Sequence, residues 1–196
     1  RDEVRNIPAV GGTKQADWDE IEELRPDLVI LDREENTREM ADICPVPHHA
    51  VHITGIEDVG PELEQLAAAI ELPALVGVAA RWRKVAARPA RPRDLEDLPG
   101  IIDWWNRPRG ETRAEYLIWR KPWMAIGPNT FIHSVLVKMG IGDKLIPHDA
   151  KYPEVDLDDL DPVRTTLLFS SEPYPFDRYR DVLFKLGFSC ALIDGE

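Results

Sequence analysis

The sequence predicts an α/β protein built from two similar lobes, and three observations lead to this fold class. Short apolar runs alternate with helical segments along the N-terminal half, which is typical of a parallel α/β sheet. The same kinds of segment, a short helix, a buried strand and a polar loop, return in the C-terminal half. A stretch rich in proline and charge over residues 88–100 separates the two halves, and we place the boundary between the lobes there.

The first lobe begins with elements that local signals define. Asp17 is expected to cap a helix over residues 18–24, because an acidic residue follows it at the spacing of a capping box. The apolar run 28–31 predicts a strand that is buried on both faces. A polar helix follows, with Asn36 or Thr37 as its cap.

A long helical element is predicted after the second apolar stretch, residues 50–54. Residues 58–72 carry apolar side chains at helical spacing, and residues 73–87 continue the pattern. Together they are expected to form one long helix over 58–87, interrupted by Pro73, between the two α/β units.

The second lobe repeats the α/β pattern. Residues 101–113 contain two tryptophans without a clear period, so we expect irregular structure there. The predicted strands cover residues 116–119, 167–170 and 191–193, and the predicted helices cover residues 130–139, 156–160 and 179–186.

The charge balance disfavours nucleic acid as a partner. Lys and Arg number 24 against 36 Asp and Glu, which gives a net charge of -12. Such a field repels phosphate backbones. The acidity serves solubility, or it places some carboxylates opposite a basic partner surface; both interpretations stay open. No apolar run approaches the ~20 residues of a membrane span, and no signal peptide is visible at Arg1, where a processed or trimmed chain is one explanation.

Motifs of catalysis and of metal binding are absent from the sequence. It contains no GxSxG, P-loop, HExxH or Rossmann glycine pattern, so we expect no enzyme. Glu34 and Glu35 are adjacent and therefore point apart rather than forming a catalytic pair. Cys44 and Cys190 form no CxxC pattern; two buried thiols are expected, with one long-range disulfide as the alternative.

An ordered series of segments resembles a known family. GGTKQADWDEIEELRPDLVILDREEN (11–36) is similar to the signature of the helical-backbone metal receptors, the ABC-importer binding proteins for cobalamin, haem and ferric siderophores. The segments IWRKPWMAIGPNTFIHSVLVKMG (118–140), YPEVDLDDL (152–160) and LLFSSEPYPF (167–176) resemble the parts that open and continue the family's second lobe.

The resemblance implies a fold and a division of the chain. The fold is two Rossmann-like α/β lobes bridged by a long helix, with the ligand cleft between the lobes. The expected division is a partial N-terminal lobe over 1–57, the bridging helix and linker over 58–98, and a partial C-terminal lobe over 99–196. The family's first strand and helix and its closing helices have no counterpart, so the chain is expected to be truncated at both ends.

The resemblance also implies which residues bind a ligand. Aromatic and polar side chains follow the predicted strands, and corrin, haem or catechol chelates need wide apolar faces and a cation for their anionic groups. The expected ligand-binding residues are Thr13, Asp32, Trp119, Arg120, Trp123, Met124, Tyr152, Tyr174 and Phe176. For Trp119 a core position is the alternative, and for Thr13 and Asp32 the alternative is a turn residue and a helix cap.

We expect no metal site at three neighbouring histidines, and we expect a docking role for two aspartates. His48, His49 and His52 are dense in nitrogen, but no carboxylate or thiol completes a ligand spacing, so we expect no metal site. Asp19 and Asp158 match family positions at which an acid in each lobe meets arginines of the permease. Helix N-terminal acids favoured by the helix dipole are the alternative for both.

These expectations define a function. The chain is predicted to be a monomeric, extracytoplasmic substrate-binding component of an ABC importer that delivers a metal chelate to a permease. It is expected to have no intrinsic cofactor, because the corrinoid, haem or ferric siderophore is the cargo. A cytoplasmic binding or sensing protein on the same fold is the first alternative, and a metal- or cobalamin-dependent enzyme domain is the second.

Overall fold

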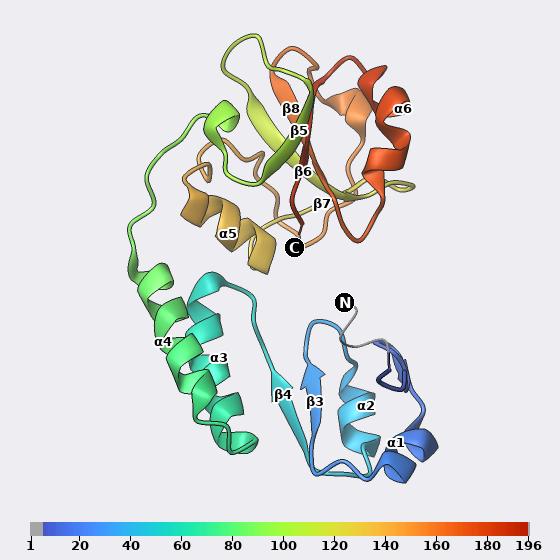
Figure 1. Cartoon of the computed structure of the whole chain (residues 1–196). Coiled ribbons are helices and arrows are strands. Elements are labelled where there is room, and N and C mark those ends of the chain that lie inside the picture. The colour runs from blue at the N-terminus through green and yellow to red at the C-terminus, as the bar shows by residue number, and fades with distance from the viewer. Residues whose placement is uncertain (1–5, 196) are drawn as a thin grey trace. The chain divides into compact units, whose positions relative to one another are not determined.

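The computed structural model describes residues 6–195. They fall into two compact units, and the chain divides between Ala87 and Arg88. The division falls after the helical segment, so that segment belongs with unit 1, whereas the sequence predicted a separate bridging region over 58–98. Each unit is α/β (Figure 1). Within the described residues, no helix combines the length and apolar character that a membrane span requires.

Unit 1 contains a two-stranded parallel sheet flanked by helices. Its elements in chain order are β1 (Gly11–Gly12), β2 (Gln15–Ala16), α1 (Trp18–Leu24), β3 (Val29–Asp32), α2 (Arg38–Ile43), β4 (His48–Val51), α3 (Ile56–Ala69) and α4 (Ala74–Ala87). β1 and β2 form an antiparallel hairpin, and β3 pairs in parallel with β4. The predicted helix, strand, helix, strand order is confirmed, although the second strand begins earlier than predicted, at His48.

The caps of the first two helices follow from the sequence. Asp17 accepts a hydrogen bond from Glu20 N at 3.1 Å and begins α1 as predicted. Thr37, rather than Asn36, is the cap of α2, because its hydroxyl accepts from Met40 N at 3.2 Å. Asn36 is thereby available for another role.

The predicted burial of the first strand on both faces is wrong. Successive strand residues point to opposite faces of a sheet. Leu31 is buried, but Ile30 is 51% exposed. A run of apolar residues therefore does not distinguish a strand covered on both sides from one that is covered on one side only.

The single long helix predicted over residues 58–87 is also wrong. α3 and α4 pack against each other as a hairpin (Figure 1). The turn is a Schellman motif: Glu71 adopts φ 52°, Leu72 N donates to Ala67 O, and Glu71 N donates to Ala68 O. Glycine usually occupies the left-handed position, so the glutamate there concealed the helix end from sequence reasoning.

Unit 2 is built on a five-stranded mixed sheet in the order β5-β9-β8-β6-β7. β6, β8 and β9 are parallel, and β5 and β7 are antiparallel edge strands. The elements in chain order are η2 (Leu95–Asp97), β5 (Ile101–Asn106), β6 (Arg113–Trp119), β7 (Met124–Ala125), α5 (Phe131–Met139), η3 (Leu157–Asp159), β8 (Thr165–Ser170), η4 (Phe176–Tyr179), α6 (Arg180–Phe184) and β9 (Ser189–Ile193).

The predicted irregular segment 101–113 contains an edge strand, which corrects that prediction. β5 pairs with β9 through two register shifts, after Ile101 and after Trp104. Bulges of this kind break the alternation of buried and exposed residues by which a strand is recognised in a sequence. The predicted strands β6, β8 and β9 and the predicted helix α5 are confirmed, with bounds shifted by a few residues.

Two apolar clusters cover the two faces of the unit 2 sheet. Leu136 of α5 packs with Leu168 and Ile193 on one face, and Leu183 of α6 packs with Leu167 and Phe169 on the other. Figure 1 shows the two helices on opposite sides of the sheet. Because both faces of the sheet are covered, β8 is buried along its whole length, including its residues Thr165, Thr166 and Ser170.

Both cysteines are free thiols. Cys44 donates from Sγ to Val46 O at 3.3 Å. Burial raises the pKa of Cys190 to about 11, so this thiol stays protonated at neutral pH.

Candidate functional site

The predicted aromatic residues of unit 2 come together where two parallel strands end. Trp119 is the last residue of β6, and the loop after β8 carries Tyr174 and Phe176. Because β6 and β8 are parallel neighbours, their carboxyl ends lie at one edge of the sheet, where open α/β sheets bind ligands. The ring centroids of Trp119 and Tyr174 are 5.1 Å apart in an edge-on contact. Those of Tyr174 and Phe176 are 4.6 Å apart.

A cation lies within this aromatic group. The guanidinium carbon of Arg120 is 5.8 Å from the ring centroid of Trp123 and 5.1 Å from that of Tyr179. Tyr179 also stacks on Tyr174 at 5.7 Å. Tyr179 was not among the predicted site residues, because it falls at the start of a predicted helix and not in a strand-end loop. We call Trp119, Arg120, Trp123, Tyr174 and Tyr179 the aromatic–cation site.

The site holds one fixed positive charge among neutral rings. Desolvation and the Tyr179 hydroxyl raise the pKa of the Tyr174 phenol, and Arg120 opposes this shift. Tyr174 is therefore neutral at physiological pH and can donate a hydrogen bond. Arg120 is charged at any physiological pH, so the site favours a flat apolar partner that carries an anionic group.

The predicted aromatic residues differ in how far their side chains are exposed to a ligand. Trp119 is 44% exposed, which excludes the alternative of a core tryptophan. Phe176, which we expected to line a ligand surface, is instead fully buried and stacks beneath Trp123, with centroids 6.4 Å apart. Phe176 therefore supports the rings above it.

Met124 and Tyr152 lie on two adjoining segments of unit 2. Met124 belongs to β7 and forms an antiparallel bridge with Glu154. Tyr152 is 44% exposed on the segment 148–155, and Val155 N of that segment donates to Trp123 O at 3.0 Å. The segment that carries Tyr152 is therefore joined to the loop that carries Trp123.

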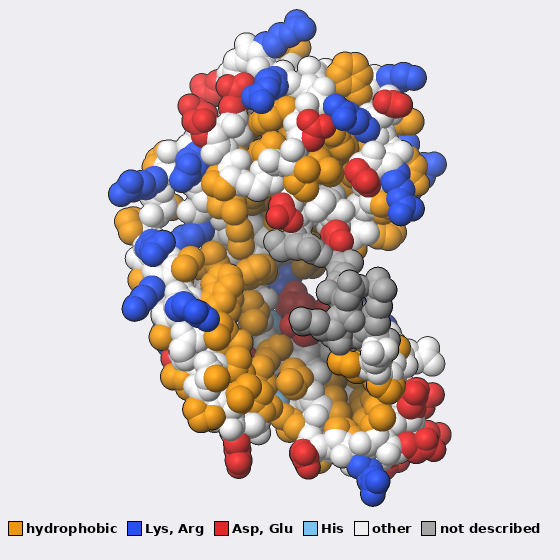
Figure 2. Space-filling view, viewed as in Figure 1, with side chains coloured by type: hydrophobic (Ala, Val, Ile, Leu, Met, Phe, Trp, Pro, Cys, Tyr) orange, Lys and Arg blue, Asp and Glu red, His pale blue; other side chains and the backbone are white. Residues whose placement is uncertain are grey.

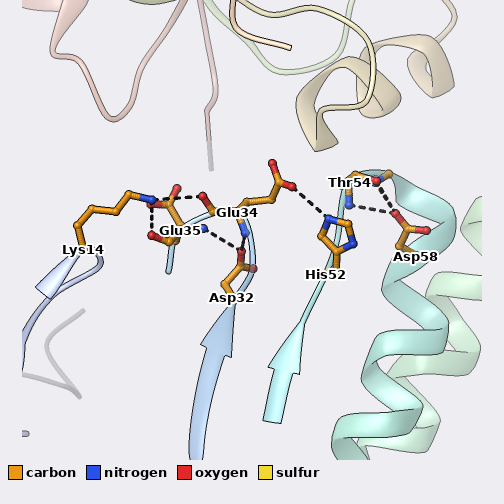
Figure 3. Close-up of polar contacts among 8 residues, drawn as sticks. Lys14, Asp32, Glu34, Glu35, His52, Thr54 and Asp58 are labelled. Atoms are coloured by element: carbon orange, nitrogen blue, oxygen red, sulfur yellow. Dashed lines mark hydrogen bonds and ion pairs between the residues drawn. The ribbon is translucent and has the colours of Figure 1, made fainter. Parts of the chain in front are cut away.

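A polar network occupies the corresponding strand ends of unit 1 (Figure 3). The Asp32 carboxylate, at the end of β3, accepts from Glu34 N at 2.7 Å and from Glu35 N at 3.3 Å. Lys14 donates to the backbone carbonyls of both glutamates. Figure 3 shows the Glu34 and Glu35 side chains directed to different partners, His52 and Lys14, which confirms that they form no carboxylate pair.

Asn36 joins the two predicted unit 1 residues, Thr13 and Asp32. Its Oδ1 accepts from Asp32 N at 2.7 Å, and its Nδ2 donates to Thr13 O at 2.8 Å. A cavity of about 470 Å³ lies beside this network and is lined by Leu31, Asp32, Asn36, Thr37, Ala41 and Ala50, with Arg33 and Arg38 also contributing. Sequence reasoning treated Asn36 only as a helix cap and missed this role.

The three histidines have separate environments. His48 and His49 are consecutive residues of β4 and so point to opposite faces of the sheet. His52 Nε2 lies 3.2 Å from Glu34 Oε1. Across residues 6–195, no group of three or more His, Cys, Asp or Glu side chains is arranged to hold a metal ion.

The two predicted docking acids are exposed. Asp19 lies in the first turn of α1, whose cap is Asp17, and Asp158 lies in η3, whose cap is Asp156. Neither carboxylate therefore serves as the cap of its helix. Figure 2 shows acidic side chains gathered over the α1 region, at the lower right of the view.

Comparisons with known proteins find similar structures at low sequence identity. No family model and no curated protein matches the chain. The structure of the periplasmic haem-binding protein BhuT with two haems matches with a TM-score of 0.67 at 16% identity, over 99% of this chain and 76% of that one. The haem-binding protein HutB of Vibrio cholerae matches with a TM-score of 0.61 at 11% identity, over 98% and 77% of the chains.

A vitamin B12-binding protein has the same architecture. The periplasmic protein BtuF of Vibrio cholerae matches with a TM-score of 0.56 at 16% identity, over 92% of this chain and 71% of that one. These solved structures are described as binding proteins and not as enzymes. Over nearly its whole length, the chain therefore has the α/β fold of the periplasmic haem- and vitamin B12-binding proteins, the helical-backbone metal receptors that its sequence resembles.

Proposed function

We propose that this protein binds a metal-containing chelate with apolar faces, either a haem, a corrinoid or a ferric siderophore, and is the substrate-binding component of an ABC importer. The observation that carries the proposal is the aromatic–cation site at the strand ends of unit 2. Exposed Trp119 and the Arg120 guanidinium, set among tyrosines, match the apolar face and the anionic edge of such ligands.

Each part of the site has a distinct task in this proposal. Trp119 stacks on the ligand face, and Tyr152 extends the apolar surface along the neighbouring segment. Arg120 pairs with a carboxylate of the ligand, and the neutral Tyr174 phenol donates a hydrogen bond to it. The protein needs no resident cofactor, because the chelate itself is the cargo.

A titration with candidate ligands tests the proposal. Haemin, cobalamin and a ferric catecholate are added to the purified protein, and binding is followed by visible absorption and by the shift in thermal midpoint. Trp119→Ala is expected to weaken binding by roughly 1–3 kcal/mol, the scale of a buried aromatic anchor. Failure of all three chelates to bind or to raise the midpoint at saturation would refute the proposal.

Arg120 offers a matched control within the same unit. Arg107 lies over Trp104, with its guanidinium carbon 5.6 Å from the ring centroid, and so repeats the cation–ring contact away from the site. We expect Arg120→Gln to weaken binding of the anionic haemin more than that of cobalamin, and Arg107→Gln to change neither affinity. Equal losses in the two variants would show that the effect is not local to the site.

The proposed partner is a permease at the outer face of the membrane, contacted through Asp19 and Asp158. Charge reversal of both residues to Lys is expected to abolish transport and to leave ligand affinity unchanged, because both side chains are exposed. Single reversals are expected to weaken docking more at low salt than at high salt, since exposed pairs are screened within ~10 Å at 0.1 M. Transport that survives the double reversal would remove these residues from the interface.

A further inference from the structure

A carboxylate is buried in the middle of the unit 2 sheet and takes no part in the proposed site. Glu115 of β6 is 1% exposed. Its oxygens Oε1 and Oε2 lie 3.0 Å and 3.1 Å from His148 Nε2. Desolvation raises the pKa of Glu115, and the contact with His148 opposes that shift. A buried carboxylate at this position costs free energy unless a partner such as His148 compensates for it.

His148 begins the segment that carries Tyr152. Three backbone hydrogen bonds attach this segment to β7 and its flanks: Gly127 N donates to Lys151 O at 2.7 Å, Ala125 N to Pro153 O at 2.9 Å, and Val155 N to Trp123 O at 3.0 Å. At Gly127 the two backbones are so close that a Cβ atom would collide with Ala150 O. The path of residues 148–155 therefore depends on close, directional contacts.

We propose that His148 is a positioning residue: its contact with Glu115 anchors the segment 148–155 to the sheet and thereby sets the place of Tyr152 beside the aromatic–cation site. This inference rests on the proposed function for its effect on ligand binding, but the anchoring itself does not. The contact lies at the start of the segment, and the three backbone bonds continue it toward Trp123.

The contact is expected to respond to pH. The sheet register places Leu167 and then Cys190 across from Glu115. Arg113 lies two residues before Glu115 on β6, and Asp149 and Lys151 follow His148 in the chain. Arg113 is directed to Leu145 O, and Cys190 stays neutral at neutral pH. As the pH falls through the raised pKa of Glu115, the carboxyl becomes neutral and no longer offers His148 a charged acceptor. The anchor should therefore weaken as the pH falls, and this weakening should begin at a pH above the range in which ordinary carboxyl groups titrate.

Hydrogen exchange of the ligand-free protein tests the anchoring. We expect His148→Ala to lower the protection of the amides of Ala125, Gly127 and Val155, and to spare Ser171 and Asp194, which donate to Ile193 O and Gly100 O elsewhere in the unit. His148→Gln should restore protection, because its amide can donate to either form of Glu115. In His148→Gln, the protection of these three amides, taken relative to that of Ser171 and Asp194, should also vary less with pH than in the wild type. Unchanged protection in His148→Ala would overturn the proposal, as would a pH profile that is the same in His148→Gln and the wild type.

Haemin affinity separates this inference from the proposed function. Gly127→Ala displaces the segment, because its Cβ would collide with Ala150 O and press on His148 Cβ, but it keeps both Glu115 and His148 in the protein; it therefore gives the loss of affinity that displacement produces without removing either partner. His148→Ala is expected to lose about ten-fold in haemin affinity, the scale of one hydrogen bond to a charged group, and His148→Gln to recover most of it. Lost protection with unchanged haemin affinity would overturn the link to the ligand. Lost protection in a protein that binds no chelate at all would support the anchoring and refute the proposed function.

Discussion

The carboxyl ends of the parallel strands carry different kinds of side chain in the two units. In unit 1, Asp32, Asn36 and Lys14 fill the strand ends with hydrogen bonds to nearby backbone groups. In unit 2, the corresponding edge carries aromatic rings around one guanidinium. A polar network of this kind satisfies itself, whereas exposed rings leave apolar surface for a partner. Under the proposed function, the aromatic–cation site of unit 2 is therefore expected to contribute more to ligand binding than the polar network of unit 1.

The sheets beneath these sites differ in the same sense. β8 of unit 2 is buried at every residue, and apolar clusters cover both faces of its sheet. Within residues 6–195, β3 of unit 1 pairs with β4 alone, and its Ile30 is exposed. Unit 2 therefore depends on packing, and unit 1 depends more on directional hydrogen bonds. This difference can be broken or sharpened by substitution.

The largest effect is expected for the core of unit 2. Phe169 is fully buried and lies within 4.9 Å of Phe176 and 5.4 Å of Trp105, measured between ring centroids. Phe169→Ala should lower the free energy of unfolding by about 3–5 kcal/mol, because it leaves a cavity that the sheet cannot close. Leu31→Ala in unit 1 should cost about 2 kcal/mol, at the low end for such changes. Urea unfolding measures both, and a larger loss for Leu31→Ala would reverse the comparison.

A smaller effect on the free energy of unfolding is expected when the asparagine side chains that join two segments are removed. Asn36 makes two hydrogen bonds that connect Asp32 with Thr13, whereas Asn106 in unit 2 makes one, from Nδ2 to Phe188 O at 2.8 Å. We predict a loss of about 2 kcal/mol for Asn36→Ala and about 1 kcal/mol for Asn106→Ala. Thermal unfolding of the two variants tests the order of these values. An equal or smaller loss at Asn36 would contradict the view that unit 1 depends on directional bonds.

The third prediction concerns the charge buried in unit 2. Because burial raises the pKa of Glu115, the folded state favours its protonated form relative to the unfolded state. The net contribution of Glu115 to stability is therefore greatest at low pH and falls as the pH rises through the folded pKa, because the desolvation of the charged form outweighs its contact with His148. Relative to Glu115→Gln, the wild type should lose stability with rising pH, by at most about 1.4 kcal/mol per pH unit. Urea unfolding from pH 4 upward measures the difference, and a slope of opposite sign would contradict the raised pKa.

The smallest effect is expected in the turn of unit 1. Glu71 has φ 52°, a region that costs a residue with a side chain roughly 1 kcal/mol. Glu71→Gly should raise the free energy of unfolding by about 0.5–1 kcal/mol, since the gain is partly offset by the greater freedom of glycine in the unfolded chain. Glu57→Gly inside α3 is the control and should destabilise the protein. A loss of stability at both positions would show that the turn conformation is not a source of strain.

Local signals predicted most of the helices and strands. Asp17 caps α1 as its sequence context indicates, and the apolar runs at β6, β8 and β9 are strands. Errors arose where the residue type did not indicate the backbone conformation, as at Glu71, which ends a helix in a conformation that glycine usually adopts. They also arose where bulges disturbed the alternation in β5. Burial was misjudged at Ile30, because a strand's sequence does not reveal what covers each face.

The candidate sites were predicted in part, for a related reason. Trp119 and Tyr174 adjoin strand ends, so the topology of parallel strands was enough to bring them together. Tyr179 and Asn36 sit beside helix starts, and their contacts depend on the geometry of the chain around them. Glu115 and His148 are separated by 33 residues, and only the folded sheet makes them neighbours.

The positions of the tryptophans make their intrinsic fluorescence a probe of ligand binding. Trp18 and Trp82 belong to unit 1, and Trp104, Trp105, Trp119 and Trp123 belong to unit 2. Trp105 is buried beside Phe169 and Trp123 is half-buried, whereas Trp119 is exposed to water and its emission should be red-shifted. A coloured chelate on the site would absorb the light that these indoles emit and quench the red edge first. A spectrum of the unlabelled protein would therefore show which rings a ligand covers.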